Sequence, residues 1–153
     1  FNCTSDYSQL IKSLLLKEEL KNCEVISDDK IKSEILKKSI FAVAKSGTVS
    51  LEICNFKIPS IIIYKMNSLN FFIVKSLVKV KFANIINIAA NKEIIPELLQ
   101  SKCNSKNIFN TVNALLNDKN SLNEQVMKTQ EIIDKFRTNK SSEIASSVLL
   151  NNL

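Results

Sequence analysis

The residues whose types and spacing suit chemistry gather around the only glycine of the chain. This glycine lies in the run Lys45-Ser46-Gly47-Thr48, between an apolar stretch and a segment with helical character. Such a turn presents backbone N–H groups at a helix N-terminus, which favours a phosphate ligand, and the Thr48 hydroxyl can add a donor. A plain strand-to-helix turn capped by Ser46 or Thr48 explains the same residues without a ligand.

A carboxylate follows on the same predicted helix. Glu52 lies four residues after Thr48, and therefore on the same face and one turn further along. A carboxylate accepts hydrogen bonds well, so Glu52 can hold the two hydroxyls of a ribose. A solvated helix residue is the other interpretation, and the spacing alone favours it.

A second polar cluster occupies residues 87–100, with asparagine, lysine, glutamate and glutamine around one proline. Glu93 and Glu97 would share a helix face one turn apart, and paired carboxylates are typical of glycoside hydrolysis. A solvated helix start is the alternative, because Pro96 suits a first helical turn and acidic residues there interact favourably with the helix dipole.

A basic amphipathic segment runs from Leu69 to Lys81. It combines aromatic and aliphatic residues with lysines, a pattern typical of helices that lie on an anionic membrane surface. A core helix with a lysine-rich outer face is the alternative. The membrane-facing candidates are Phe71, Phe72, Lys75 and Lys79.

Metal and histidine chemistry are not expected in this chain. It has no histidine, and its four cysteines, at positions 3, 23, 54 and 103, form no Cys-x-x-Cys pair. We therefore expect no metal and no cofactor, and any acid–base chemistry must use carboxylates, tyrosine or lysine. We interpret the cysteines as buried small apolar residues of a protein in a reducing cytosol.

The net charge of +6 is compatible with nucleic-acid binding, but the kind of basic residue argues against it. Only Arg137 among the 21 basic residues is an arginine, whereas base readout and bidentate phosphate contacts favour arginine. We therefore expect no nucleic-acid partner. No apolar run is long enough to cross a membrane, because lysines interrupt the most hydrophobic stretch, 69–90.

The elements that must position these residues are short apolar strands that alternate with helices. Strands are predicted at 23–26, 40–44, 60–64 and 83–88. Helices are predicted at 7–20, after a cap at Ser27 or Asp28, at 48–55, at 69–80, from Glu93 or Pro96 to Gln100, and through the last third of the chain. This alternation predicts an α/β domain with a parallel sheet, whose ligands bind at the carboxyl ends of the strands.

The order of these motifs resembles the lipid-A-disaccharide synthases. That family carries Ser-Gly-Thr-x-x-Leu-Glu, a proline before an apolar strand ending in Tyr-Arg, Leu-Val-Lys, and Asn-Leu-x-Ala-Gly-Arg-Glu-x-x-Pro-Glu-Leu-Leu-Gln. This sequence has Ser46-Gly47-Thr48 with Leu51-Glu52, Pro59 with Tyr64-Lys65, Leu77-Val78-Lys79, and Asn87 through Gln100. The order and spacing match without a gap over this region, and the lone glycine and both prolines fall on motif positions.

The resemblance implies a glycosyltransferase of the GT-B type, in which two Rossmann-like halves face a cleft and the C-terminal half holds the nucleotide sugar. This chain would be that half, with a Rossmann-like parallel sheet flanked by helices over 1–118 and C-terminal helices over 119–153. Such enzymes transfer a hexosyl group from UDP-2,3-diacylglucosamine to 2,3-diacylglucosamine 1-phosphate (lipid X), giving the lipid A disaccharide and UDP. They need no metal.

The resemblance also implies which residues meet the donor. The pyrophosphate would lie at Ser46-Gly47-Thr48 and the ribose at Glu52, and segment 87–100 would close on the sugar and the phosphates. The donor-binding candidates are therefore Ser46, Gly47, Thr48, Glu52, Tyr64, Lys65, Asn87, Asn91, Lys92, Glu93, Glu97 and Gln100. No catalytic residue is assigned here, because the catalytic base is expected in the acceptor domain.

Several positions depart from the family pattern. Lys65 and Lys92 stand where arginine is usual, which loses bidentate contact with phosphate. Asn91 replaces a glycine, although asparagine tolerates the left-handed conformation, and Ile86 replaces a proline. The chain begins with Phe1 and carries neither the family's Pro-Gly-Ser-Arg loop nor its acceptor domain. We therefore expect a piece of a longer enzyme that is inactive alone.

Two other functions are compatible with the sequence. A membrane-surface lipid-binding module would use the segment Leu69–Lys81, and another GT-B enzyme that uses UDP-N-acetylglucosamine would use the same nucleotide site. The expected partners are both acylated glucosamine substrates, a missing N-terminal domain and the cytoplasmic face of the inner membrane of a Gram-negative bacterium. The amphipathic tail Ser121–Leu153 is compatible with a homodimer that exchanges helices, although no residue demands one.

Overall fold

The structure, a computed structural model, describes residues 1–67, 81–137, 146, 149 and 150. The chain divides into two compact units, Phe1–Ser39 and Ile40–Leu153. Each unit has its own secondary structure, and the candidate site belongs to the second one.

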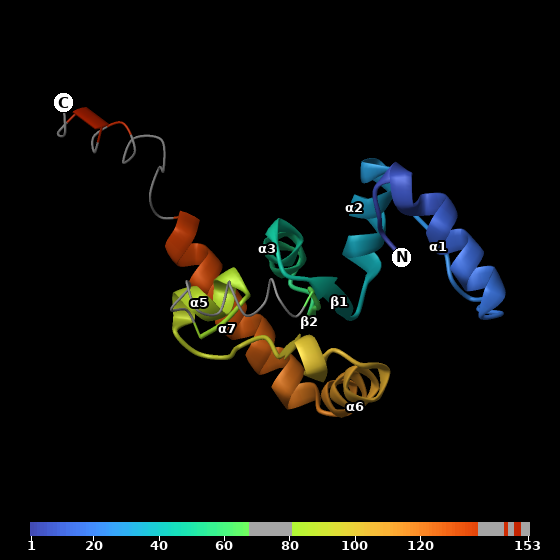
Figure 1. The fold of residues 1–153 in the computed structure, drawn as a ribbon. Helices are drawn as coiled ribbons and strands as arrows, with labels where there is room; N and C mark the ends of the chain where they lie inside the picture. The colour runs from blue at the N-terminus through green and yellow to red at the C-terminus, as the bar shows by residue number, and fades with distance from the viewer. Residues whose placement is uncertain (68–80, 138–145, 147–148, 151–153) are drawn as a thin grey trace. The chain divides into compact units, whose positions relative to one another are not determined.

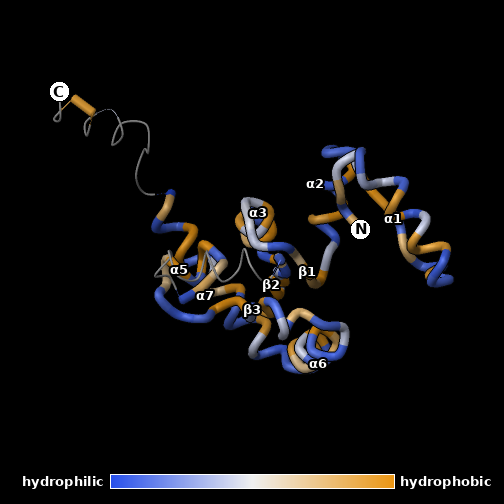
Figure 2. The backbone as a smooth tube through the Cα atoms, in the orientation of Figure 1, coloured by the Kyte–Doolittle hydropathy of each residue, from blue (hydrophilic) through white to orange (hydrophobic). Residues whose placement is uncertain are grey.

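The first unit contains two helices. These are α1 (Ser5–Lys17) and α2 (Asp29–Lys38), close to the predicted positions. The predicted cap of α2 is confirmed, because the Asp28 carboxylate accepts hydrogen bonds from the backbone N–H groups of Lys30 and Ile31 at 2.7 and 3.3 Å. No residue of either helix is buried, and Figure 2 shows hydrophobic and hydrophilic residues mixed along α1.

The second unit is built on a three-stranded sheet. Its strands are β1 (Ala42–Lys45), β2 (Ser60–Tyr64) and β3 (Glu97–Leu99), in the order β1-β2-β3. The paired strands β1 and β2 lie side by side in Figure 1. Both pairings are parallel, with Val43 opposite Ile61 and Ile63 opposite Leu98. Helices connect the strands, as parallel strands require. The predicted α/β class with a parallel sheet is therefore confirmed.

Helices flank this sheet and cover its central strand. They are α3 (Thr48–Asn55), α5 (Ile85–Ala90), the 3-10 helix η1 (Gln100–Lys102), α6 (Ser105–Leu116) and α7 (Lys119–Arg137). The long helix α7 packs against α3, α5 and α6 (Figure 1). The second unit thereby gathers segments from most of its length around one core.

Isoleucine dominates this core. Ile61 and Ile62 of β2, together with Ile86 and Ile95, have no exposed surface. A β-branched residue suits a strand that is covered on both faces. Burial of each such side chain contributes roughly 1.5–3 kcal/mol relative to exposure. The second unit therefore has the packing that holds its candidate site in place.

Two predicted elements of the second unit are wrong. Residues 83–88 were expected to be extended, but Ile85–Ala90 forms the helix α5. The Asn84 side chain accepts a hydrogen bond from the Ile86 N–H at 2.9 Å, which caps the helix, and Asn91 ends it in the left-handed conformation. A run of apolar residues this short does not distinguish a strand from a buried helix.

The second wrong element is the helix predicted from Glu93 or Pro96 to Gln100. Residues Glu97–Leu99 instead form β3, which pairs with β2. The Pro96 carbonyl accepts the Ile62 N–H at 2.9 Å, and a proline just before a strand loses no ladder hydrogen bond. Glu93 and Glu97 therefore do not share a helix face, which removes the geometric basis for paired-carboxylate hydrolysis.

The first unit also differs from expectation near Cys23–Ile26. Within the described residues this segment forms only an isolated parallel bridge, between Asn2 and Ile26. The expectation of buried cysteines holds for Cys54 alone, because Cys23 is exposed and the other two are half-buried. Cys23 is exposed because the predicted strand 23–26, which would have buried it, does not form. The domain boundary after residue 118 stays a prediction.

The predicted helix 69–80 and the tail beyond Arg137 lie largely outside the described residues. Within the part that the structure describes, no helix is both long enough and apolar enough to cross a membrane.

Candidate functional site

The candidate phosphate turn joins β1 to α3. Gly47 precedes α3 with φ 151° and ψ −166°, a backbone region that only glycine adopts without strain. A Cβ at Gly47 would meet no atom within 4 Å, so the backbone conformation, and not a lack of space, requires glycine. Because glycine has no side chain to cap α3, an anion can take the place of the capping group.

The turn lines a hollow of about 320 Å³, a volume typical of small-ligand pockets. Ser46, Gly47 and Thr48 form its polar part. The apolar part consists of Leu51, Ala83, Ile85 and Ile88. The Ser46 hydroxyl donates a hydrogen bond to the Ala83 carbonyl at 2.6 Å, which ties the turn to the residues that lead into α5. The sequence did not predict this hydrogen bond.

Lys45 and Tyr64 lie beside the turn, at the carboxyl ends of neighbouring strands. The Lys45 ammonium lies 5.3 Å from the centre of the Tyr64 ring, within the range of a cation–π interaction. Tyr64 was a predicted site residue, and the structure places it half-buried at the edge where a ligand is expected. Lys45 was not singled out, although its position directly before Ser46 was a signal for it.

Three other predicted residues also lie at this edge of the sheet or near it. Glu52 is half-buried on α3, one turn after Thr48, as its spacing implied. Lys65 directly follows β2 and is exposed. Thr48, Glu52 and Lys65 therefore follow the carboxyl ends of β1 and β2, which is the edge where α/β sheets bind their ligands.

Asn87 and Glu97 lie in the interior. The Asn87 Oδ1 accepts the N–H groups of Ile94 and Ile95 at 2.8 and 2.9 Å. Its Nδ2 donates to the Ile95 carbonyl and to the Glu97 carboxylate, both at 2.7 Å. Both polar atoms of this fully buried side chain are thus engaged within the chain. Asn87 therefore organises the loop before β3, and its contact with the donor stays a prediction.

A second hollow of about 330 Å³ brings together three predicted residues, Glu93, Glu97 and Gln100. The other lining residues are Lys81, Phe82, Leu99, Ser101 and Lys102. The Gln100 side chain bonds the backbone of Met66, accepting its N–H at 2.8 Å and donating to its carbonyl at 3.3 Å. Gln100 thereby links the segment after β2 to the segment after β3.

The predicted residues Asn91 and Lys92 are exposed after α5. Asn91 adopts φ 49° and ψ 30°, the left-handed conformation expected where the family has glycine. This feature of the sequence prediction is confirmed. The predicted membrane-facing candidates Phe71, Phe72, Lys75 and Lys79 lie outside the described residues.

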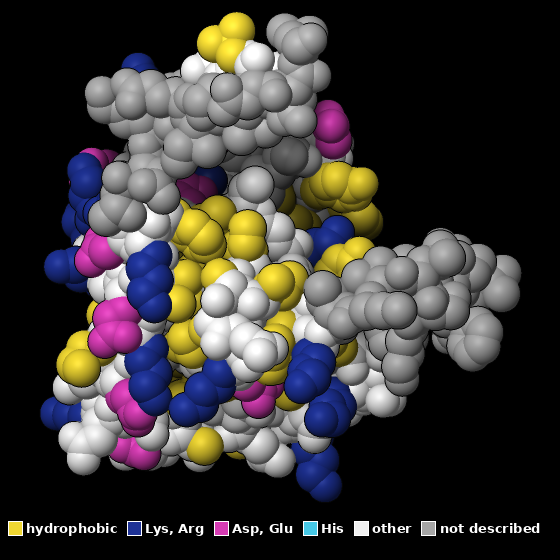
Figure 3. Space-filling model, turned by 90° about the vertical axis from the view of Figure 1, so that its left-hand side faces the viewer, with side chains coloured by type: hydrophobic (Ala, Val, Ile, Leu, Met, Phe, Trp, Pro, Cys, Tyr) yellow, Lys and Arg dark blue, Asp and Glu magenta, His cyan; other side chains and the backbone are white. Residues whose placement is uncertain are grey.

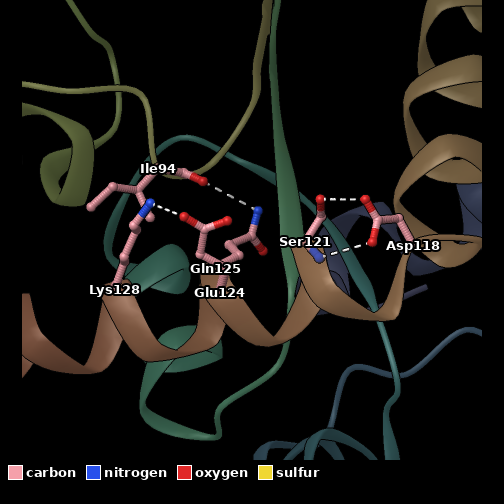
Figure 4. Close-up of polar contacts among 6 residues, drawn as sticks. All are labelled: Ile94, Asp118, Ser121, Glu124, Gln125 and Lys128. Atoms are coloured by element: carbon pink, nitrogen blue, oxygen red, sulfur yellow. Dashed lines mark hydrogen bonds and ion pairs between the residues drawn. The ribbon is translucent and has the colours of Figure 1, made fainter.

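The loop before β3 is also tied to α7, and Figure 4 shows the contact between Gln125 and Ile94. The buried Gln125 accepts the Ser60 N–H at 2.7 Å and donates to the carbonyls of Ser60 and Ile94 at 3.1 and 3.4 Å. Next to it on the helix, Lys128 pairs with Glu124, and this hydrogen bond lowers the pKa of the Glu124 carboxyl. Gln125 therefore anchors α7 to the start of β2.

The start of α7 has its own acidic cap. The Asp118 carboxylate accepts the hydroxyl of Ser121 at 2.6 Å and its N–H at 3.1 Å (Figure 4). These hydrogen bonds, led by the one from the hydroxyl, lower the pKa of Asp118. Both contacts belong to the helix start and stabilise it, so this cluster is structural.

Basic and acidic side chains are interspersed on the face shown in Figure 3, and hydrophobic side chains lie between them. A nucleic-acid site would favour a continuous basic patch. Within the described residues, no group of three histidine, cysteine, aspartate or glutamate side chains is placed to hold a metal ion. The absence of a nucleic-acid partner and of a cofactor stays a prediction.

Comparison with known proteins connects this geometry to one family. The model of a family described as lipid-A-disaccharide synthetase matches residues 2–150. The lipid-A-disaccharide synthase of Rickettsia felis is 37% identical over 146 residues, which cover 94% of this chain and 36% of that protein. That of Rickettsia canadensis is 38% identical over 139 residues, covering 91% of this chain and 35% of that protein.

A third relative, the lipid-A-disaccharide synthase of Rickettsia prowazekii, is 35% identical over 147 residues, covering 94% of this chain and 38% of that protein. The chain thus spans somewhat more than a third of the length of these relatives. The family match extends over nearly every residue, including the turn at Gly47 and the loop before β3. The chain therefore belongs to the lipid-A-disaccharide synthetase family.

Proposed function

We propose that this chain supplies the nucleotide-sugar-binding half of a lipid-A-disaccharide synthase. The whole enzyme would transfer a hexosyl group from UDP-2,3-diacylglucosamine to 2,3-diacylglucosamine 1-phosphate, forming the lipid A disaccharide and releasing UDP. Family membership supports this reaction. The parallel sheet with flanking helices supports the proposal that the half is Rossmann-like and of the GT-B type.

The observation that carries the proposal is the turn at Gly47. Its glycine-only conformation places the start of α3 at the carboxyl end of β1, beside a hollow of ligand size. The pyrophosphate of the donor would accept hydrogen bonds from the first-turn N–H groups of α3 and from Thr48. Lys45 adds a positive charge within the same turn. Oriented donors of this kind stabilise the negative charge that develops on a leaving diphosphate.

Glu52 would bind the ribose of the donor. It lies one turn after Thr48 on α3, so a nucleotide whose phosphates sit at the helix start can extend its ribose toward Glu52. The second hollow, lined by Glu93 and Gln100, would take the donor sugar. No step of the proposed reaction needs a metal, since the helix start and the nearby lysines supply the positive charge.

The chain alone would bind the donor without turning it over. It has no histidine, and the acceptor and the catalytic base would belong to another domain of the longer enzyme. The substrates carry acyl chains, so the enzyme would work at the cytoplasmic face of the inner membrane as a peripheral protein. The alternative of a membrane-surface module relies on Phe71 and Phe72, and no observation within the described residues favours it.

The test uses the single glycine as a reporter. Chain labelled with [15N]glycine gives one glycine amide resonance, that of Gly47, and we expect UDP to shift it. Calorimetric titration with UDP gives the affinity in parallel. Glu52→Ala should weaken binding about tenfold or more, because a charge-assisted hydrogen bond contributes roughly 1.5–3 kcal/mol.

Glu131→Ala is the matched control, since it removes an exposed carboxylate from α7 and should leave the affinity unchanged. If the chain is folded and saturating UDP does not shift the Gly47 resonance, the proposed site is contradicted. Binding that is equally strong in Glu52→Ala would remove Glu52 from the site while leaving the turn at Gly47 in it.

A further inference from the structure

A buried carboxylate that the proposed chemistry does not use lies beneath the site. Glu97, the first residue of β3, is 9% exposed. Its Oε2 accepts the Ala83 N–H at 2.8 Å, and its Oε1 accepts the Asn84 N–H at 2.9 Å and the Asn87 side-chain amide at 2.7 Å. Three N–H donors therefore surround one carboxylate, and all three come from the segment around the start of α5.

These hydrogen bonds orient the peptide between Ala83 and Asn84, and a residue of the turn at Gly47 bonds the same peptide. The Glu97 carboxylate holds the N–H groups of two consecutive residues, Ala83 and Asn84, so it sets the orientation of the peptide between them. The carbonyl of that peptide belongs to Ala83 and accepts the Ser46 hydroxyl at 2.6 Å. A continuous chain of hydrogen bonds thus runs from Glu97 through Ala83 to Ser46, the neighbour of Gly47.

The residues along this chain also line the hollows. Ser46 and Ala83 lie on the walls of the hollow at the Gly47 turn, and Glu97 contributes to the second one. A change in the Ala83–Asn84 peptide would therefore move one wall of the nucleotide pocket and release the Ser46 side chain. The oxygens of a carboxylate are both acceptors, and an amide side chain at position 97 would turn an N–H donor toward one of the three donors.

We propose that Glu97 is a positioning residue for the nucleotide site: it holds the Ala83–Asn84 peptide so that the Ala83 carbonyl fixes Ser46 and the Gly47 turn. This proposal rests on the proposed function, since it concerns the affinity of that same site. It also predicts an effect on the ligand-free chain, because the hydrogen bonds exist without a nucleotide.

The experiment is a double-mutant cycle on the [15N]glycine-labelled chain. The variants are Glu97→Gln, Ser46→Ala and the double variant, with Glu131→Gln as the control for an exposed glutamate. We expect each single substitution to weaken UDP binding about tenfold, the effect of a lost hydrogen bond to a charged or positioned group. The double variant should be no weaker than the worse single one, because both changes break the same chain of hydrogen bonds.

The ligand-free spectrum separates this proposal from the proposed function. Glu97→Gln should move the Gly47 resonance in the absence of UDP, because Glu97 acts on the turn at a distance, and Glu131→Gln should not move it. If the wild-type chain binds no UDP, the nucleotide site fails while this shift still supports the positioning by Glu97. If Glu97→Gln leaves the ligand-free resonance in place, the positioning role is overturned whatever UDP does.

Two further outcomes are decisive. Losses of affinity that multiply in the double variant would mean that Glu97 acts independently of Ser46, which overturns the proposal. If Glu97→Gln fails to fold by circular dichroism, Ser46→Ala and Ser46→Thr carry the test, because Ser46 is only half-buried. The threonine keeps the hydroxyl and should keep the wild-type affinity for UDP, whereas an unchanged affinity in Ser46→Ala would overturn the proposal.

Discussion

The two compact units differ in where their apolar side chains lie. In Phe1–Ser39 the helices have no buried residue, and Leu10, Leu14 and Leu16 of α1 are half or more exposed. In Ile40–Leu153 four isoleucines are completely buried, and α7 packs on three other helices. Both units have amphipathic helical sequences, but only the second buries apolar side chains of its described helices.

This difference teaches that helical periodicity and stability are separate properties of a sequence. Isolated helices of this length are marginal in water, and most of their stability comes from packing of the apolar face. The second unit packs its helices on a sheet, whereas α1 and α2 carry half-exposed apolar faces. We therefore expect amide hydrogens of the first unit to exchange much faster than those of β2 and α7.

The largest expected effect comes from deleting core atoms in the second unit. Ile62 has no exposed surface and lies in the central strand, so Ile62→Ala should lower the free energy of unfolding by about 2–5 kcal/mol. Leu14→Ala makes a similar deletion on a side chain that is 50% exposed and should cost less than about 0.5 kcal/mol. Urea denaturation followed by circular dichroism measures both.

Equal losses from these two substitutions would break the comparison, because they would show that Leu14 is packed as well as Ile62. Val43→Ala provides a control within the second unit, since Val43 lies on a strand but is 46% exposed. Its cost should fall between the other two.

The next effect concerns a buried polar contact, which the structure shows only in the second unit among the described residues. Gln125 holds both the N–H and the carbonyl of Ser60, at the start of the central strand. Gln125→Ala should lower the free energy of unfolding by about 2–3 kcal/mol, because it leaves a buried N–H without an acceptor. Asn123→Ala, at an exposed position of α7, should change it little.

Thermal unfolding of the two variants measures this difference. A small effect of Gln125→Ala would mean that water replaces the side chain and that the start of β2 is less enclosed than its burial indicates. In that case the second unit would depend on its isoleucines alone.

The third effect is a pH dependence that one buried thiol confers on the second unit. Burial raises the pKa of Cys54 from 9.0 to about 11. Between pH 9 and 11 the Cys54 thiol therefore keeps its proton in the folded chain and loses it in the unfolded chain. The contribution of Cys54 to the free energy of unfolding is thus intact below pH 9 and falls as the pH rises toward 11. The free energy of unfolding should fall by about 2 kcal/mol over this range. The pH dependence of the free energy of unfolding of Cys54→Ala should lack this loss.

Thiol labelling applies the same contrast to both units. At pH 8 an alkylating reagent should modify the exposed Cys23 quickly and the buried Cys54 only when the second unit unfolds. Peptide mapping by mass spectrometry after timed labelling separates the two sites. Rapid modification of Cys54 in the absence of denaturant would contradict the burial of α3 against α7.

The sequence predicted those elements whose boundaries depend on local chemistry. The bounds of α3 and β2 were predicted to the residue, because Gly47 marks the start of the helix and the isoleucine run after Pro59 marks the strand. The turn at Gly47 was predicted for the same reason, and its binding of phosphate stays a prediction. Its conformation depends on a glycine that no other residue can replace without strain.

The strand β3, which the sequence did not predict, depends on a contact between distant segments. Residues 97–99 form a strand only because β2 offers them a partner. The polar residues of segment 87–100 were interpreted as ligand contacts, but Asn87 and Glu97 bond each other and the loop around them. Nothing in local spacing distinguishes an amide that meets a ligand from one that meets a buried backbone.

The smallest expected effect lies in the first unit, at the cap of α2. Asp28 accepts two backbone N–H groups there, and Asp28→Ala should destabilise the helix by about 1 kcal/mol. Because no residue of α2 is buried, the effect should stay within Phe1–Ser39. Amide exchange in α2 should become faster, while amide exchange in β2 and α7 and the thermal unfolding of the second unit remain unchanged.

Asn84→Ala removes the corresponding cap of α5, whose residue Ile86 is fully buried, and should lower the unfolding temperature of the second unit. If loss of either cap accelerates amide exchange in β2 and α7 equally, the two units unfold together. The two units would then differ in packing but not in cooperativity.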